Sequence, residues 1–374
     1  MLYKSCCILL VMLGFVNCSD DASMTSTDTN NEINETPSPP LTPLDTISYF
    51  PPIASGEWAS VALTQLGWNS DAEQPLHDFL EESATKAFIL LYDGRMVIEW
   101  YFDDHTQNTN WYWASAAKTL TAFTMGVAQA EGLLDIEEAT TLYLGQGWTT
   151  ATAAEENEIT IRNQLTMTTG LNNIHFDCTD PECLTYVADP GTRWAYHNAP
   201  YTLLQEVVAQ ASGMEWSTYF KQNVRDRLGM DGFWLSTNTY NNVYFSTARS
   251  MARFGLLNLN QGIWQDTPIL TDRTYQAEMI NTSQDLNQSY GYLWWLNGKS
   301  SYHLPDTQLE ISGSLIPNAP TDTFMGLGRD DQKLYVVPSQ KLVVVRMGEA
   351  AGTDTLGPSS YDNILWERLN ALIN

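Results

Sequence analysis

The 374-residue sequence has few cationic side chains. Lys and Arg together number 18 against 44 Asp and Glu, which gives a formal net charge of −26 at pH 7. A surface with this charge repels polyanions and anionic bilayers, because like charges raise the free energy of contact. We therefore expect no nucleic-acid partner and no broad electrostatic attachment to a membrane.

Several motifs that would define an enzyme class are also absent. The sequence contains no G-x-S-x-G, H-E-x-x-H, P-loop or G-x-G-x-x-G pattern, which argues against α/β-hydrolases, zinc proteases, NTPases and dehydrogenases. No run of 18 apolar residues occurs, which argues against an integral membrane bundle. Five histidines are scattered without a zinc-like spacing: His77, His105, His175, His197 and His303. The sequence predicts no metal site and no cofactor.

The N-terminus has the pattern of an export signal. After Lys4, residues 6–16 are almost entirely apolar but too few to span a bilayer comfortably. After one intervening residue comes Cys18. The junction resembles a bacterial lipoprotein cleavage site, where the Cys becomes the lipidated N-terminus. Asn17 stands where such sites usually carry a small residue, so a plain secretory signal with an incidental Cys is the alternative. We expect residues 1–18 to be a lipoprotein-type signal and the protein to be exported to the periplasmic face or the cell surface.

Residues 19–55 have the composition of a flexible segment. They are rich in Ser, Thr, Asp, Asn and Pro, and no Lys or Arg occurs between Lys4 and Lys86. Such a composition cannot bury enough apolar area to offset the entropy lost on ordering. We expect an acidic tether that holds a folded domain, residues 56–374, off a surface. The membrane is then a partner only through a lipid at Cys18.

Cysteine usage is consistent with export. Cys6 and Cys7 belong to the signal, so only Cys178 and Cys183 remain in the expected domain. In an oxidising compartment two cysteines this close in the sequence should form a disulfide. The alternative, a metal-binding pair, lacks a C-x-x-C spacing and has only His175 nearby.

Hydrophobic periodicity predicts an α/β domain with an insertion. Apolar, β-rich runs predict two hairpins, one at 87–92 and 96–101 and one at 334–337 and 342–347. Helical patterns occur at 119–129, 159–167, 200–211, 216–228 and 361–373. We expect an antiparallel sheet flanked by helices, built from residues about 56–114 and 240–374. A mostly helical lobe, residues about 115–239, is inserted between the two parts.

The pattern with the clearest chemistry is Ser115-Ala116-Ala117-Lys118. A Ser at a helix start and a Lys three residues later lie on one face of the helix. The helix N-terminus offers backbone N–H groups to an oxyanion, and a Lys made neutral by burial can accept the Ser proton. A Tyr held as phenolate by the same Lys is the other candidate base. A second copy, Ser83–Lys86, leads into a strand rather than an amphipathic helix.

Tyr-x-Asn, which would supply such a Tyr, occurs three times. Tyr361 lies in the predicted C-terminal helix, and Tyr240 is not preceded by a turn and an aromatic residue. Tyr196-His197-Asn198 follows the turn sequence Asp-Pro-Gly-Thr-Arg-Trp at 189–194. We therefore select Tyr196. The intervening His would alternate away from the nucleophile, so it is not predicted to be catalytic.

With these motifs the chain resembles the serine-hydrolase family of class C β-lactamases, penicillin-binding carboxypeptidases and related esterases and amide hydrolases. The resemblance runs from about residue 83 to 372 and rests on the stretches 115–119, 159–171, 190–198, 251–257 and 291–295. It implies a β-lactamase/transpeptidase-like fold and a small ester or amide substrate. It also implies Ser115 as nucleophile, Lys118 and Tyr196 in proton transfer, and Asn198 as the residue that orients the acyl side.

The third motif of this family, usually Lys-Thr-Gly or His-x-Gly, is altered. The matching place is 328–332, where Arg329 stands for the Lys or His and Asp331 for the Gly. The resemblance implies that Arg329 and Gln332 bind substrate, and that the backbone N–H groups of Ser115 and Gln332 form the oxyanion hole. Because two Asp residues follow Arg329, we expect its field to be weak and the substrates to be neutral or amine-bearing rather than penicillins. A catalytically silent relative that binds peptidoglycan fragments at the cell surface is the alternative.

Aromatic residues surround these motifs. Trp111, Tyr112 and Trp113 precede the nucleophile, where they would either line an acyl pocket or anchor a packed strand. Trp194 and the pair Trp294–Trp295 are expected to pack in the core.

Overall fold

The computed structural model describes residues 48–236, 242–353 and 356–374. The predicted signal, Cys18 and most of the predicted tether lie outside these residues. The end of the tether is bound to the domain: Tyr49 N–H donates to the Asp93 carbonyl at 3.0 Å, and the buried Arg253 guanidinium donates to the carbonyls of Pro51 and Pro52. The folded domain therefore begins before residue 56, because a composition that favours flexibility does not exclude binding through backbone carbonyls.

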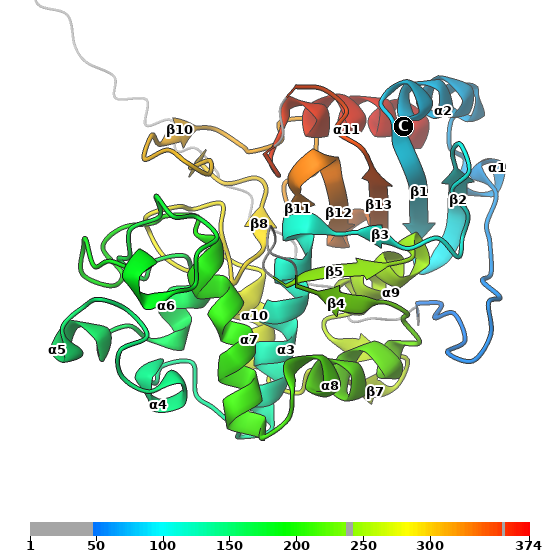
Figure 1. The fold of residues 1–374 in the computed structure, drawn as a ribbon. Coiled ribbons are helices and arrows are strands. Elements are labelled where there is room, and N and C mark those ends of the chain that lie inside the picture. The colour runs from blue at the N-terminus through cyan, green and yellow to red at the C-terminus, as the bar shows by residue number, and fades with distance from the viewer. Residues whose placement is uncertain (1–47, 237–241, 354–355) are drawn as a thin grey trace, which may run out of the picture. The chain divides into compact units, whose positions relative to one another are not determined.

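A six-stranded antiparallel sheet is the centre of the α/β lobe (Figure 1). In spatial order its strands are β2 (Arg95–Tyr101), β1 (Thr85–Tyr92), β13 (Leu342–Gly348), β12 (Gln332–Val337), β11 (Phe324–Gly328) and β8 (Trp295–Leu296). Because β1 pairs with β13, N-terminal and C-terminal parts of the domain meet in one sheet. This confirms both predicted hairpins and the divided α/β lobe.

Different helices cover the two faces of the sheet, because side chains alternate along each strand. On one face lies α9 (Ala248–Leu259), where Gly255 permits close approach: a Cβ there would lie 2.4 Å from a methyl carbon of Val343. Tyr335 of β12 faces the other side and packs on Trp366 of α11 (Ser360–Ile373). α2 (Glu73–Glu82) lies beside α11 on that second face (Figure 1).

The inserted lobe is mostly helical, as predicted. Its central helix is α3 (Lys118–Ala130), which packs against α7 (Asn198–Ser212). α10 (Arg273–Met279) also packs against α3, although it belongs to the part of the chain that was predicted for the α/β lobe. Residues 118–128 of α3 are all buried, so this helix belongs to the cores of both lobes.

The remaining short helices and strands of the domain are α1 (Leu63–Leu66), α4 (Thr141–Leu144), α5 (Ala153–Glu156), β3 (Trp111–Tyr112), β4 (Phe233–Leu235), β5 (Val243–Ser246), β6 (Ile263–Trp264), β7 (Thr267–Pro268), β9 (Ser301–Tyr302) and β10 (Ile311–Ser312).

One helix is shorter than periodicity predicted. The pattern at 159–167 yields only α6 (Ile161–Leu165), because Met167 adopts a left-handed backbone with φ +61°. The pattern at 216–228 is helical along its whole length, but only α8 (Trp216–Phe220) is an α-helix, and a π turn and a 3₁₀ turn follow it. Periodicity also missed β11, whose sequence Phe-Met-Gly-Leu-Gly contains no β-branched residue.

The predicted disulfide between Cys178 and Cys183 is present in the structure. It closes a short loop that includes the 3₁₀ turn Pro181–Cys183. Among the described residues, no helix has both the length and the apolar character needed to cross a bilayer.

Candidate active site

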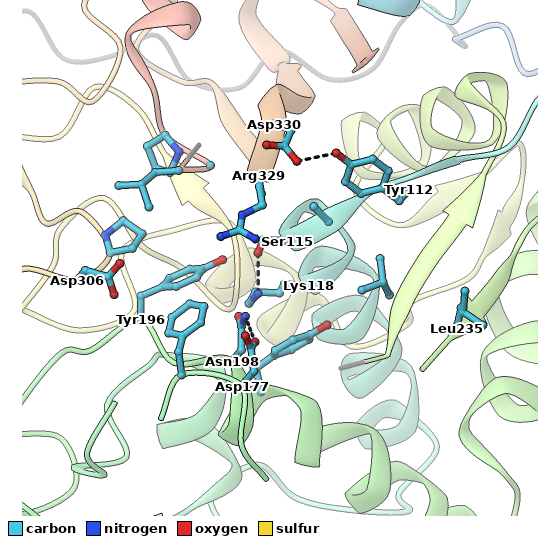
Figure 2. A pocket seen from close by; sticks show the side chains of 18 of the residues that line it. Tyr112, Ser115, Lys118, Asp177, Tyr196, Asn198, Leu235, Asp306, Arg329 and Asp330 are labelled. Atoms are coloured by element: carbon cyan, nitrogen blue, oxygen red, sulfur yellow. Dashed lines mark hydrogen bonds between the residues drawn. The ribbon is translucent and has the colours of Figure 1, made fainter. Parts of the chain in front are cut away.

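A cavity of about 630 Å³ lies where β11, the start of α3 and the start of α7 meet (Figure 2). Its wall combines aromatic rings, acidic side chains and two basic side chains. These are Tyr112, Phe176, Tyr196, Tyr201 and Phe245, then Asp177, Asp306 and Asp330, and finally Lys118 and Arg329. Ser115 and Asn198 also line it. The cavity therefore brings together five of the site residues predicted from the sequence, Ser115, Lys118, Tyr196, Asn198 and Arg329, whereas Gln332 is not part of the lining.

Ser115 lies in the 3₁₀ turn Ala114–Ala117, directly before α3. Strand β11 approaches this turn so closely that only glycine fits at 328. A Cβ on Gly328 would lie 2.4 Å from the Trp113 carbonyl oxygen and 3.1 Å from the Ala116 nitrogen. The end of β11 and the nucleophile turn therefore lie against each other, backbone to backbone.

The acid–base character of Lys118 is changed by its surroundings. Its Nζ donates to Ser115 Oγ at 2.9 Å, and its side chain is almost fully buried. Burial lowers the pKa of Lys118 from 10.5 to about 7, although the charge of Asp177 opposes this effect. Nζ lies 4.9 Å and 4.3 Å from the ring centres of Tyr196 and Tyr201. At neutral pH a large fraction of Lys118 is therefore uncharged and able to accept a proton.

Tyr196 is also buried, at 5% exposure, and points toward Ser115 in Figure 2. Burial raises the pKa of Tyr196 above its ordinary value, and a hydrogen bond with Ser115 acts in the opposite direction. Its ring stacks between Phe176 and Trp295, with ring centres 6.0 Å and 5.8 Å away. A protonated phenol is therefore held beside the nucleophile.

Asn198 is positioned by a segment that the sequence did not single out. Its Nδ2 donates to Asp177 Oδ1 at 2.7 Å, and its backbone N–H donates to the Phe176 carbonyl at 3.1 Å. Asp177 comes directly before Cys178 of the disulfide. In the sequence, the one indication that this carboxylate matters is its position next to a cysteine of the predicted disulfide.

The altered third motif has two acidic residues with different roles. Asp330 lines the cavity and accepts a hydrogen bond from the Tyr112 hydroxyl at 2.7 Å. Asp331 is 1% exposed and its Oδ1 lies 3.1 Å from Lys333 Nζ. Asp331 therefore acts on Arg329 less directly than Asp330 does, because its carboxylate is buried in an ion pair with Lys333, which also pairs with Asp362.

Gln332 does not fit the substrate-binding role that the resemblance implied. Its side chain is fully buried, donates to the carbonyls of Asp330 and Gly348 at 2.8 Å and 2.6 Å, and does not line the cavity. It is the first residue of β12 and pairs with Gly328 of β11. Its backbone and side chain are thus committed to the hairpin, and the prediction that Gln332 contacts substrate is corrected.

The remaining candidates divide between wall and core. Tyr112 lines the cavity, whereas Trp113 is fully buried and donates from Nε1 to Ser246 Oγ at 2.7 Å. His197 is 2% exposed and is not part of the lining, as its alternation predicted. Tyr240 lies outside the described residues. Within the described ranges, no three His, Cys, Asp or Glu side chains are grouped so that they could hold a metal ion.

Comparisons with known proteins identify the family and the fold. The Beta-lactamase family model matches residues 80–365, more than half of the chain. A protein assigned as a 6-aminohexanoate-dimer hydrolase from Bacillus anthracis superposes with a TM-score of 0.64 at 19% identity, covering 86% of this chain and 88% of that one. A family VIII carboxylesterase superposes with a TM-score of 0.62 at 13% identity, covering 84% and 99%.

A relative by sequence is an uncharacterised protein of Alkalihalophilus pseudofirmus. It is 24% identical over 313 residues, which cover 74% of this chain and 87% of the relative. Fold and cavity define a β-lactamase/transpeptidase-type serine hydrolase class. The chain belongs to the Beta-lactamase family.

Proposed function

We propose that the protein hydrolyses esters or simple amides through an acyl-enzyme formed on Ser115. The observation that carries this proposal is the 2.9 Å hydrogen bond between Ser115 Oγ and a buried Lys118 whose pKa is about 7, in the wall of a 630 Å³ cavity. A neutral Lys118 takes the Ser115 proton as Oγ attacks the carbonyl carbon. The acyl group is then released by water.

Tyr196 is the second proton-transfer group in this proposal. Because burial raises its pKa, the phenol stays protonated and does not start the reaction as a base. It can instead pass a proton to the leaving group while it receives one from the protonated Lys118. Lys118 as primary base and Tyr196 as relay is the assignment that both pKa directions support.

The oxyanion hole is proposed to consist of the Ser115 and Arg329 backbone N–H groups. Asn297 N–H, on the β8 side of β11, donates to the Thr323 carbonyl at 2.9 Å, so the backbone groups of Thr323 point away from β12. Because successive residues of a strand point their backbone groups to opposite sides, the odd-numbered residues along β11 share this direction. Alternation gives Arg329 N–H the same direction, toward the nucleophile turn that Gly328 contacts. This moves the expected donor from Gln332 to Arg329, and Arg329 then acts through its backbone whatever its side chain does.

The cavity favours neutral or amine-bearing substrates over substrates with a carboxylate. Asp177, Asp306 and Asp330 all line it, against the exposed guanidinium of Arg329 and a Lys118 that is only partly protonated at neutral pH. A carboxylate on the substrate would therefore meet a net negative field. Five aromatic rings in the wall suit an apolar acyl or leaving group.

Fluorophosphonate labelling followed by an activity panel tests the proposal. We expect wild-type protein to be labelled on Ser115, and short-chain nitrophenyl esters to be cleaved with a higher kcat/KM than nitrocefin. The Ser115→Ala protein is the matched control and should show neither. Absence of labelling and turnover would instead support the catalytically silent alternative, a binding protein for peptidoglycan fragments. Faster turnover of nitrocefin than of every ester would contradict the substrate class.

We also propose that the protein is exported and anchored by a lipid on Cys18. The apolar segment before Cys18, the acidic composition of 19–47 and the Cys178–Cys183 disulfide support this location. Mass spectrometry of membrane-extracted protein should find Cys18 as a lipidated N-terminus. A mature protein that begins elsewhere, with a free Cys18 thiol, would contradict the anchor.

A further inference from the structure

The turn that carries Arg329 has an unusual backbone. Asp330 and Asp331 both have φ +57°, in the left-handed region that glycine normally occupies. Asp tolerates this region better than most residues, but two in succession are strained unless neighbouring groups hold them. The buried Arg346 guanidinium donates to the carbonyls of both residues at 3.0 Å, so the turn is held from outside.

The side chain of Asp331 is a second anchor for this turn. Its Oδ1 accepts from Ser359 Oγ at 2.6 Å and lies 3.1 Å from Lys333 Nζ. Its Oδ2 accepts from the Ala351 backbone N–H at 3.0 Å. Both oxygens are therefore bound within the protein, and the carboxylate is directed away from the cavity.

Lys333 connects this anchor to a different part of the cavity wall. Its Nζ is fully buried and donates to the Gly357 carbonyl at 2.6 Å and to Asp362 Oδ2 at 2.9 Å. Leu356, Gly357 and Pro358 line the cavity. Gly357 packs on the end of β11, since a Cβ there would lie 2.7 Å from the Leu327 carbonyl oxygen. One ammonium thus contacts the anchor of the turn, the adjacent wall and the first turn of α11.

Stability alone does not account for such a cluster. Taking charges out of water is costly, and apolar residues of similar volume often serve folding equally well. What a buried ion cluster supplies is geometry, because each charge admits few arrangements of its partners. Burial by itself would raise the pKa of Asp331, but Lys333 and the hydrogen bonds from Ser359 and Ala351 lower it, so the carboxylate remains charged.

We propose that Lys333, acting through Asp331, is a positioning residue of the active site. It holds the turn that presents the Arg329 N–H and the wall 356–358 in one fixed arrangement. This inference rests on the proposed function. Lys333 touches no substrate; its effect is exerted on the backbone donor that stabilises the oxyanion.

Kinetics of four variants test the proposal. Asp331→Gly suits the left-handed backbone but deletes the anchor, and Lys333→Met deletes the connection. Each should lower kcat for a nitrophenyl ester about tenfold or more with KM within about threefold, because the oxyanion donor acts mainly in the transition state. Asp331→Asn tolerates the same φ but keeps only one acceptor oxygen and no charge, so it should recover only part of the kcat lost in Asp331→Gly. Glu99→Gln is the control: it removes a carboxylate bound by Arg249 outside the cavity and should leave kcat unchanged.

Hydrogen exchange measures the connection without substrate. In Lys333→Met, amides in 327–332 and 356–359 should exchange faster together, whereas Glu99→Gln should change neither segment. Wild-type kcat in a folded Asp331→Gly protein, or faster exchange confined to one segment in Lys333→Met, would overturn the proposal. If wild-type protein turned over no more substrate than Ser115→Ala, the hydrolase assignment would be rejected. Hydrogen exchange would still show whether Lys333 joins the two segments, because it needs no substrate.

Discussion

The chain contains the same four-residue pattern twice, and the two copies have different surroundings. Ser83 ends α2 and donates to the Leu80 carbonyl at 3.1 Å, while Lys86 lies in β1 and pairs with Asp103 at 2.6 Å. Ser115 and Lys118 are hydrogen-bonded to each other at 2.9 Å. Spacing in the sequence is equal, but only the second copy lies on a continuous helical start where residues three apart share a face.

The two lysines differ in charge for a physical reason. A hydrogen bond that Lys86 donates to Asp103, with smaller contributions from the charges of nearby acidic residues, raises the pKa of Lys86 above 10.5. Burial lowers that of Lys118 to about 7. A lysine with carboxylate partners stays charged and cannot act as a base, whereas a lysine buried away from water loses its proton easily. The comparison shows that burial, and not the motif, creates the candidate base.

The largest expected effect distinguishes the two serines. Ser115→Ala removes the nucleophile and should lower kcat for esters at least ~10⁴-fold, whereas Ser83→Ala should leave kcat within about twofold. Steady-state hydrolysis and fluorophosphonate labelling measure both. Full activity in Ser115→Ala together with loss of activity in Ser83→Ala would reverse the assignment.

The next effect distinguishes the two lysines. Lys118→Met and Tyr196→Phe should each cost about a hundredfold or more in kcat, because each removes a proton-transfer group. Combining them should cost far less than the product of the single losses, since the two groups act as a unit. Lys86→Met, the matched control, should retain activity. A multiplicative double variant would show that the two residues do not share one proton path.

A smaller effect is the pH dependence that follows from the pKa of Lys118. The base form is neutral, so kcat/KM should rise with pH through a midpoint of about 7. Below the midpoint it should fall about tenfold per pH unit, as protonation removes the base. A pH series with a nitrophenyl ester, corrected for hydrolysis by buffer, measures the midpoint. A profile that is flat from pH 5 to 9 would exclude Lys118 as the titrating group.

The smallest effect tests whether a nearby carboxylate raises the pKa of Lys118, as Asp103 raises that of Lys86. The charge of Asp177 raises the pKa of Lys118, opposing burial. Asp177→Asn should therefore shift the midpoint of the pH profile downward by less than about one unit. Asp78→Asn, on α2, is a control with the same charge change and should leave the midpoint unchanged. An upward shift in Asp177→Asn would contradict the electrostatic account.

Sequence reasoning identified the fold class, both hairpins and the disulfide, because these depend on local patterns and on pairs close in sequence. It also selected Ser115, Lys118, Tyr196, Asn198 and Arg329, whose side chains line one cavity. It misassigned Gln332, since nothing local indicates that the hairpin buries this side chain, and it did not foresee the ion pair of Asp331 with Lys333. Asp177 and Asp306 were missed because isolated acidic residues in an acidic chain carry no signal.

By itself the sequence determined which chemical groups are available and which local elements carry them: a Ser and a Lys at one helix start, a Tyr after a turn, and two cysteines five positions apart. Only the tertiary structure decided their states. The pKa of Lys118, the protonated phenol of Tyr196 and the direction of the Arg329 N–H depend on burial and strand register. Both arise from contacts between segments far apart in the chain, because desolvation is a property of the packed core and not of any single element.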